Sequence, residues 1–275
     1  MKNNDFDLIS TRLDDIKSFD QGDPFPHAVI DGFLPSSLMD KIYSLFPSPN
    51  SEIWERYKYE HQIKLATNEV HHLSDPLRSL FYFLNSGEFI NALEKMTGIN
   101  HILSDPHFNG AGLHQIERGG RLSVHADFSQ LENCKLYRRL NLILYLNPNW
   151  EDAFGGCLEL WDAKGENLVK SISPIMNRCV IFKTTTTSFH GHPRPLNCPE
   201  GLSRKSIALY YYTVEQDSET LGVDTRWRTA QKPRFIHRIR RGAAIFFWRV
   251  LLTFKKSLIN FENVIDKCIK KIDVN

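Results

Sequence analysis

The middle of the chain consists of short runs in which apolar and polar residues alternate, separated by turn residues. Six of these runs are predicted to be β-strands, at 112–117, 122–127, 140–147, 157–162, 178–183 and 205–213. Turn signals such as Gly119-Gly120, Asn147-Pro148-Asn149 and Gly155-Gly156 lie between them. Many short strands with this punctuation favour a sandwich or jelly roll over an alternation of strands and helices.

Apolar residues recur at helical spacing on both sides of this strand-rich part. Before it, the pattern predicts a short strand at 27–33 and helices at 38–46, 75–86 and 87–98. We interpret residues 47–75, which are rich in His, Glu and Asn, as a loop region over an active site. After the strands, residues 242–260 and 261–272 have the apolar spacing of amphipathic helices.

These patterns place the chain in the α+β class, with β-structure dominant. We expect a helical support region at 1–100 whose helices pack on one sheet. We expect the strand-rich core at 101–216 and a basic amphipathic helical extension at 217–275.

Composition narrows the partners and the compartment. The 275 residues carry a net charge of only +2, so no nucleic acid partner is expected. The five cysteines are scattered without paired spacing, which favours reduced thiols and a cytoplasmic location. The N-terminal residues lack the apolar stretch of a signal peptide, and no apolar window is long enough to span a membrane.

Basic residues gather towards the end of the chain. Residues 226–256 contain ten Lys or Arg and no acid, so the rest of the chain carries 24 basic against 32 acidic residues. Three interpretations stay open for this segment. Its helices dock on the core, or 242–260 makes peripheral contact with an anionic membrane surface, or the segment contacts a partner or second copy.

The candidate chemistry lies in His125-Ala126-Asp127 and a histidine much further along, His190. Residues two apart on a strand point to the same face, so His125 and Asp127 can reach one metal ion. Two imidazoles and one carboxylate are the ligand set of non-haem Fe(II) oxygenases, although zinc or manganese also accepts these donors. His192 competes with His190 for the third position, and a lone His-x-Asp pair is equally typical of a solvated strand.

The surrounding blocks occur in a specific order. The chain reads HAD, then RRLNLILYLNPNW, GGCLELW, RCVIFKTTTTSFHG and LSRKSIALYYY. Over residues 108–213 this order resembles the 2-oxoglutarate and Fe(II)-dependent dioxygenases of the prolyl 4-hydroxylase-like superfamily. The resemblance implies a double-stranded β-helix, which is a jelly roll.

The resemblance also implies roles for individual residues. His125, Asp127 and His190 match the iron ligands, and the position of the block favours His190 over His192. Arg204 matches the basic residue that binds the C5 carboxylate of 2-oxoglutarate, a task for which a planar guanidinium is suited. Tyr145 matches an aromatic residue whose hydroxyl assists, and Ser206 shares a strand face with Arg204.

The function implied is a hydroxylase that uses Fe(II), 2-oxoglutarate and O2, with ascorbate as a further candidate, and releases succinate and CO2. Its substrate is an unidentified protein or small molecule, with prolyl, peptide and amino-acid substrates as candidates. The alternative is a jelly-roll binding or scaffold protein with a non-catalytic metal site. The basic residues of the predicted loop 128–139, among them Arg138 and Arg139, either favour an anionic substrate or are simply solvated.

Overall fold

The computed structural model describes residues 3–105, 107–131, 134–214 and 224–228, with side chains described from Leu8 onwards. The α-helices are α1 (Asn3–Asp14), α2 (Ser36–Ser44), α3 (Asp75–Leu84) and α4 (Gly87–Thr97). The strands up to the His-x-Asp motif are β1 (His27–Asp31), β2 (Glu55–Tyr59), β3 (Gln62–Thr67), β4 (Leu103–Ser104), β5 (Gly112–Glu117) and β6 (Arg121–Ala126). The later strands are β7 (Gln130–Leu131), β8 (Leu136–Tyr145), β9 (Leu158–Trp161), β10 (Leu168–Ile172), β11 (Arg178–Lys183), β12 (His190–His192), β13 (Ser203–Thr213) and β14 (Arg226–Trp227).

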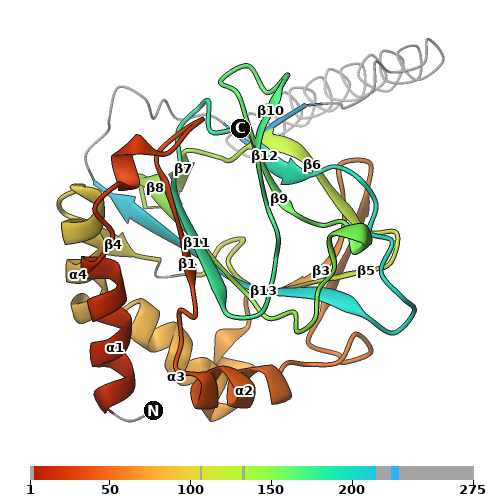
Figure 1. The fold of residues 1–275 in the computed structure, drawn as a ribbon, viewed down its shortest axis with the longest axis horizontal. Coiled ribbons are helices and arrows are strands. Elements are labelled where there is room, and N and C mark those ends of the chain that lie inside the picture. Colours follow the sequence, from red (N-terminus) through yellow and green to blue (C-terminus); the bar gives the residue numbers. More distant parts are fainter. Residues whose placement is uncertain (1–2, 106, 132–133, 215–223, 229–275) are drawn as a thin grey trace, which may run out of the picture. The chain divides into compact units, whose positions relative to one another are not determined.

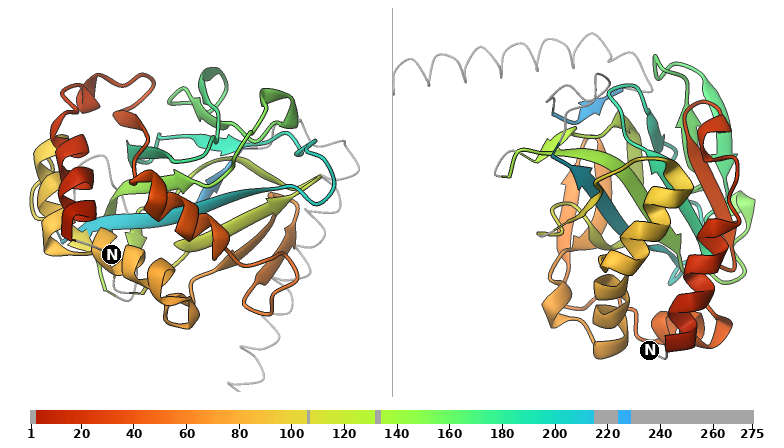
Figure 2. Two further views of the ribbon diagram at one scale, coloured as in Figure 1. Left: turned by 60° about the horizontal axis from the view of Figure 1, so that its bottom comes forward. Right: turned by 90° about the vertical axis from the view of Figure 1, so that its left-hand side faces the viewer.

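Antiparallel pairing joins the described strands into one strongly curled sheet (Figure 1). The strand order is β1-β11-β8-β13-β5-β3-β6-β12-β9-β10, so neighbours in the sheet are distant in sequence. The helices lie against the β11-β8-β13 side, and β6, β12 and β9 lie across the interior from it (Figures 1 and 2). This arrangement confirms the prediction of a mainly β, jelly-roll core with N-terminal helices on one sheet.

Strands β8 and β13 separate the hydrophobic core from the interior of the curled sheet. Alternate residues of a strand point to opposite faces. On β8, Leu140, Leu142 and Leu144 are buried in the cluster that the helices complete. The residues between them, Asn141 and Ile143, line the interior cavity instead. β13 is divided in the same way, with Ile207, Leu209 and Tyr211 towards the helices and Arg204, Ser206 and Ala208 towards the cavity.

The boundaries of α4 follow from local sequence. The hydroxyl of Ser86 accepts a hydrogen bond from the backbone N–H of Phe89, which caps the first turn. Gly98 ends the helix with a left-handed φ of 70°, a conformation that costs glycine little. The predicted end of this helix is therefore confirmed.

Two predicted loops contain strands. The stretch 47–75 holds the hairpin of β2 and β3, and β3 contributes to the cavity wall. The predicted loop 128–139 holds β7 and the first residues of β8, so the strand expected at 140–147 begins earlier. The loop predictions were wrong because β3 gains its order by pairing with the distant β5, while β7 and the first residues of β8 pair with each other as a local hairpin.

The segment Arg226–Trp227 belongs to the core sheet, since β14 pairs with β6. The sequence analysis placed these residues with the C-terminal extension. Its boundary near 216 and the helices expected at 242–260 and 261–272 lie outside the described residues and stay predictions. Within the described ranges, no helix has the length and apolar character needed to cross a membrane.

We expect Leu142→Ala to lower the free energy of unfolding by about 2–5 kcal/mol, because it removes a fully buried side chain between β8 and the helices. Chemical denaturation would measure the loss. The matched change Tyr82→Ala, at a residue that is 55% exposed on α3, should cost no more than about 0.5 kcal/mol. Equal losses in the two variants would contradict this division of core and surface.

Candidate metal centre

Pairing of β6 with β12 brings the two histidines together. His190 is the direct cross-strand partner of His125, and the centroids of their rings lie 4.5 Å apart. Asp127 follows the end of β6, and one donor atom from each of the three residues lies within 4.8 Å of the others. All three side chains are buried. The structure thus gathers the predicted triad, and His192 is not part of this group.

Backbone carbonyls orient both imidazoles. Nδ1 of His125 lies 2.9 Å from the carbonyl oxygen of Ser123, and Nδ1 of His190 lies 3.0 Å from that of Ser188. A carbonyl oxygen only accepts, so each Nδ1 carries the proton and donates. In a neutral ring Nε2 then presents a lone pair; the Nε2 atoms of His125 and His190 lie 3.4 Å from Oδ1 and 3.5 Å from Oδ2 of Asp127, respectively. Burial and the neighbouring His125 lower the pKa of His190 to about 4, so this ring is neutral near pH 7.

Asp127 is ionised although it is buried. Burial alone would raise its pKa, but the guanidinium of Arg138 holds the pKa well below its usual range. Nη2 of Arg138 lies 3.0 Å from Oδ2 of Asp127, and Asn141 donates a hydrogen bond of 2.8 Å to the same oxygen. The carboxylate is therefore charged and fixed in orientation.

These observations fit a divalent transition metal. The donors are two imidazole nitrogens and one carboxylate oxygen, which is the set that non-haem iron accepts while other coordination positions stay open. Partners that orient metal-binding histidines and carboxylates are a regular feature of such sites. A second cluster in the described residues, Glu69, His71 and His72, is fully exposed and lacks comparable support.

Arg204 is held at another part of the interior. Its side chain is 5% exposed, its Nε donates to the carbonyl oxygen of Gly156 at 2.7 Å, and its Nη2 donates to the hydroxyl of Tyr145 at 3.2 Å. Nη1 makes no hydrogen bond within the described part of the chain. Ser206 lies two residues further along the same face of β13 and lines the cavity, whereas Tyr145 lies behind Arg204 and does not.

The second glycine of the pair before β9, Gly156, is required by its close packing against Arg204. Its φ is +76°, and a Cβ atom at this position would lie 2.6 Å from Leu196 Cδ2 and 2.9 Å from Arg204 Cδ. Glycine thus allows the backbone to approach Arg204 closely enough to accept its hydrogen bond.

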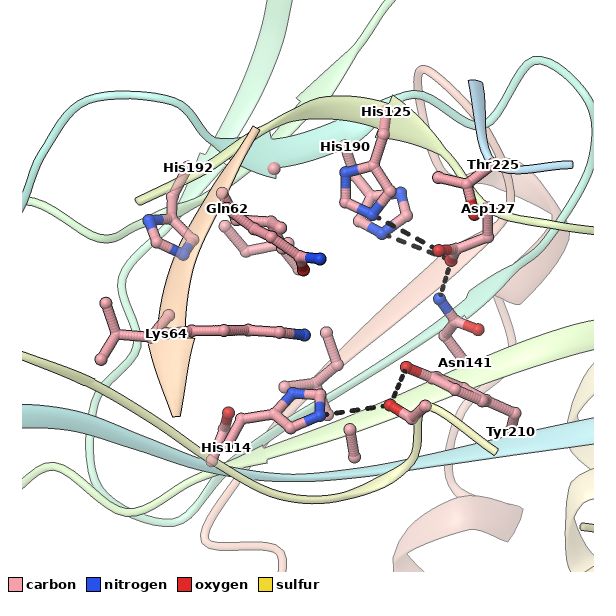
Figure 3. A pocket seen from close by; sticks show the side chains of 18 of the residues that line it. Gln62, Lys64, His114, His125, Asp127, Asn141, His190, His192, Tyr210 and Thr225 are labelled. Carbon is pink, nitrogen blue, oxygen red and sulfur yellow. Dashed lines mark hydrogen bonds and ion pairs between the residues drawn. The ribbon is translucent and has the colours of Figure 1, made fainter. Parts of the chain in front are cut away.

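A cavity of about 220 Å³ is lined by both the triad and Arg204. Figure 3 shows the triad at one side of this cavity. Pockets for drug-sized ligands measure about 300–1,000 Å³, so this space suits a small cosubstrate. Its charged lining residues are Lys64, Arg138, Arg204 and Asp127, three cations against one anion. The cavity is therefore prepared for an anionic ligand.

Lys64 is a cavity residue that the sequence did not single out, whereas His192, the alternative third ligand, lines the cavity outside the triad. Lys64 extends from β3 towards the centre of the cavity (Figure 3), and burial there lowers its pKa to about 8. His192 is 3% exposed, and neither of its ring nitrogens has a hydrogen-bond partner in the structure. Lys64 lay in a predicted loop, and no pattern in the sequence marked it as inward-facing.

Trp227 of β14 covers the metal centre from one side. Its ring stacks on His125 at a centroid distance of 4.8 Å and on His61 at 5.2 Å. Trp227 lies opposite His125 where β14 pairs with β6, so this stacking depends on a strand that follows β13 in sequence. Trp227 limits access of water to one histidine of the triad.

Comparisons with known proteins agree with this geometry. Residues 111–212 match the family model of the 2OG-Fe(II) oxygenase superfamily. The chain is 31% identical over 200 residues to the mouse protein named prolyl 3-hydroxylase OGFOD1, covering 69% of this chain and 33% of that protein. The Xenopus laevis protein of the same name is 27% identical over 210 residues, covering 73% of this chain and 37% of its own length. The chain thus spans about a third of the length of these relatives.

Solved structures show the same fold. A prolyl-4-hydroxylase from Pseudomonas putida matches with a TM-score of 0.52 at 13% identity, covering 74% of this chain and 98% of that one. A prolyl hydroxylase from Trichoplax adhaerens, solved with a peptide fragment, matches with a TM-score of 0.51 at 16% identity, covering 77% and 94%. The chain belongs to the 2OG-Fe(II) oxygenase superfamily and is of the prolyl 4-hydroxylase-like type, as the ordered sequence blocks predicted.

We expect His190→Ala to abolish tight binding of Co(II), a stable stand-in for Fe(II), because one of three donor atoms is lost. The matched change His192→Ala should leave Co(II) affinity within about threefold of wild type, since His192 is not among the gathered donors. Calorimetric titration under nitrogen would measure both. The reverse order of effects would assign the third ligand to His192.

Proposed function

We propose that this protein is an Fe(II)- and 2-oxoglutarate-dependent dioxygenase that hydroxylates a C–H bond. The buried group of His125, Asp127 and His190 carries the proposal, because its Nε2 atoms are free to bind a metal while other coordination positions remain available. Bound iron and 2-oxoglutarate would supply activation of O2 and hydroxylation of the substrate, with release of succinate and CO2.

The chain's own residues bind, orient and enclose these groups. His125, Asp127 and His190 hold the metal, and Trp227 shields it. Arg204 receives the C5 carboxylate of 2-oxoglutarate through its free Nη1, while Tyr145 fixes the guanidinium plane. Ser206, on the same face of β13 as Arg204, is assigned to the same carboxylate of 2-oxoglutarate. O2 is the second cosubstrate, and ascorbate is the reductant that we propose for keeping the iron ferrous.

The charge of the cavity supports a dianionic cosubstrate. Three cationic side chains face one carboxylate, so the dianion 2-oxoglutarate brings the balance closer to neutrality than a neutral ligand would. Neither ring nitrogen of His192 has a hydrogen-bond partner among the described residues, so a polar ligand in the cavity would satisfy them. Lys64, one of the three cationic side chains, lines the same cavity as His192.

We propose a prolyl residue in a peptide or protein as the substrate. The proposal draws on the curated relatives, which are named prolyl 3-hydroxylases, and it extends their chemistry to a chain that covers about a third of their length. A cytoplasmic location remains our proposal, supported by the four free cysteines among the described residues. Contact of 242–260 with a membrane concerns residues outside the described ranges and stays a prediction.

The reaction is tested by incubating the purified protein with Fe(II), 2-oxoglutarate and a library of proline-containing peptides. We expect a weak visible charge-transfer band under nitrogen, and succinate with a hydroxylated peptide once O2 is admitted. His125→Ala and Asp127→Ala should each abolish both signals. A protein that binds metal and 2-oxoglutarate but forms no succinate with any peptide would favour a binding or scaffold role.

We expect Gly156→Ala to weaken 2-oxoglutarate binding by at least about tenfold while Co(II) binding persists, because the new methyl group displaces Arg204. Gly201→Ala is the matched control. Gly201 has a similar φ of +81°, so both changes carry the same backbone strain, but nothing lies within 4 Å of a Cβ there. Anaerobic titration of the Co(II)-loaded proteins with 2-oxoglutarate gives the affinities. Equal weakening in both variants would show that backbone strain, and not Arg204, is responsible.

A further inference from the structure

Arg138 occupies an unusual position for an arginine. It lies on β8 with only 1% of its surface exposed, whereas the sequence analysis placed it in a loop, either solvated or favouring an anionic substrate. Its guanidinium carbon lies 3.3 Å from the ring centroid of Tyr210 and 4.8 Å from that of Phe128. The two rings hold the cation in place and limit its contact with water.

The guanidinium of Arg138 makes two contacts at the metal centre. Nε donates a hydrogen bond to Oδ1 of Asn141 at 2.8 Å, and Nη2 forms an ion pair with Oδ2 of Asp127 at 3.0 Å without hydrogen-bond alignment. Asn141 in turn donates from Nδ2 to the same Oδ2 at 2.8 Å, and its Oδ1 also accepts from Thr184 at 3.2 Å. A lysine could not make both contacts, because it presents a single point charge instead of a rigid fork.

These contacts treat the two oxygens of Asp127 differently. Oδ2 is engaged by Asn141 and Arg138 together. Each oxygen lies close to one imidazole, Oδ1 at 3.4 Å from Nε2 of His125 and Oδ2 at 3.5 Å from Nε2 of His190. Among the described residues, Asn141 and Arg138 contact only Oδ2, so Oδ1 is the oxygen that they leave open to a metal. A carboxylate that gave both oxygens to a metal would have to give up the contacts at Oδ2.

We propose that Arg138 and Asn141 are positioning residues that restrict Asp127 to binding the metal through Oδ1 alone. This inference rests on the proposed function, since it concerns how the metal site keeps room for 2-oxoglutarate and O2. A carboxylate bound through both oxygens would occupy one more coordination position. The ion pair thus protects the open positions that distinguish an oxygenase site from a closed structural metal site.

The test compares Arg138→Met with Arg139→Met in the full-length protein loaded with Co(II) under nitrogen. Arg139 is the next residue on β8 and does not contact the triad. Its variant changes the net charge of the protein by the same amount, because it also replaces one arginine with methionine. We expect Arg138→Met to retain Co(II), to show an altered visible d–d spectrum typical of a changed coordination number, and to bind 2-oxoglutarate at least about tenfold more weakly. Arg139→Met should match wild type in all three measurements.

Asn141→Ala provides a second route that leaves the buried cation in place. It frees Oδ2 from its amide donor, and we expect the spectrum to change in the same direction, which keeps the test valid if Arg138→Met does not fold. A wild-type spectrum and wild-type 2-oxoglutarate affinity in the folded variants would overturn the inference, as would loss of Co(II) from both. Failure of the wild-type protein to bind Co(II) and 2-oxoglutarate would instead refute the proposed function.

Discussion

The burial of one ionised carboxylate, Asp127, is the constraint around which the interior of this protein is organised. A charge removed from water is costly unless partners and hydrogen bonds replace its hydration. Arg138 and Asn141 provide that replacement, both from β8. These contacts hold Asp127 as an anion without a bound metal, so the carboxylate is already in the form that binds a metal ion.

The two-faced character of β8 and β13 makes such a polar interior compatible with a stable fold. Their leucine-rich faces complete the core with the helices, while their other faces carry Asn141, Arg204 and Ser206 into the cavity. Because side chains alternate along a strand, one sheet can serve packing and chemistry without mixing them. The rigidity of the packed face also restrains the residues on the opposite face, which a site with fixed ligand geometry requires.

The predictable part of the site is the part that depends on local periodicity. His125 and Asp127 share a strand face by their spacing alone, and Arg204 and Ser206 do so as well. The boundaries of β11 and the end of α4 at Gly98 also follow from residues close in sequence. Asn141, a polar residue between Leu140 and Leu142, was a usable sign of an inward-facing functional residue, although the sequence analysis did not use it.

The sequence by itself determined the strand-rich core, the pairing of His125 with Asp127 and the ordered blocks that mark the superfamily. Tertiary structure alone decided that His190 lies opposite His125, that Trp227 returns to cover it, and that Lys64 and Arg138 point inward. The reason is physical. Strand periodicity is a local property of the chain. The register between distant strands exists only once the sheet has closed. The same is true of the burial of Arg138, which makes it the partner of the Asp127 carboxylate.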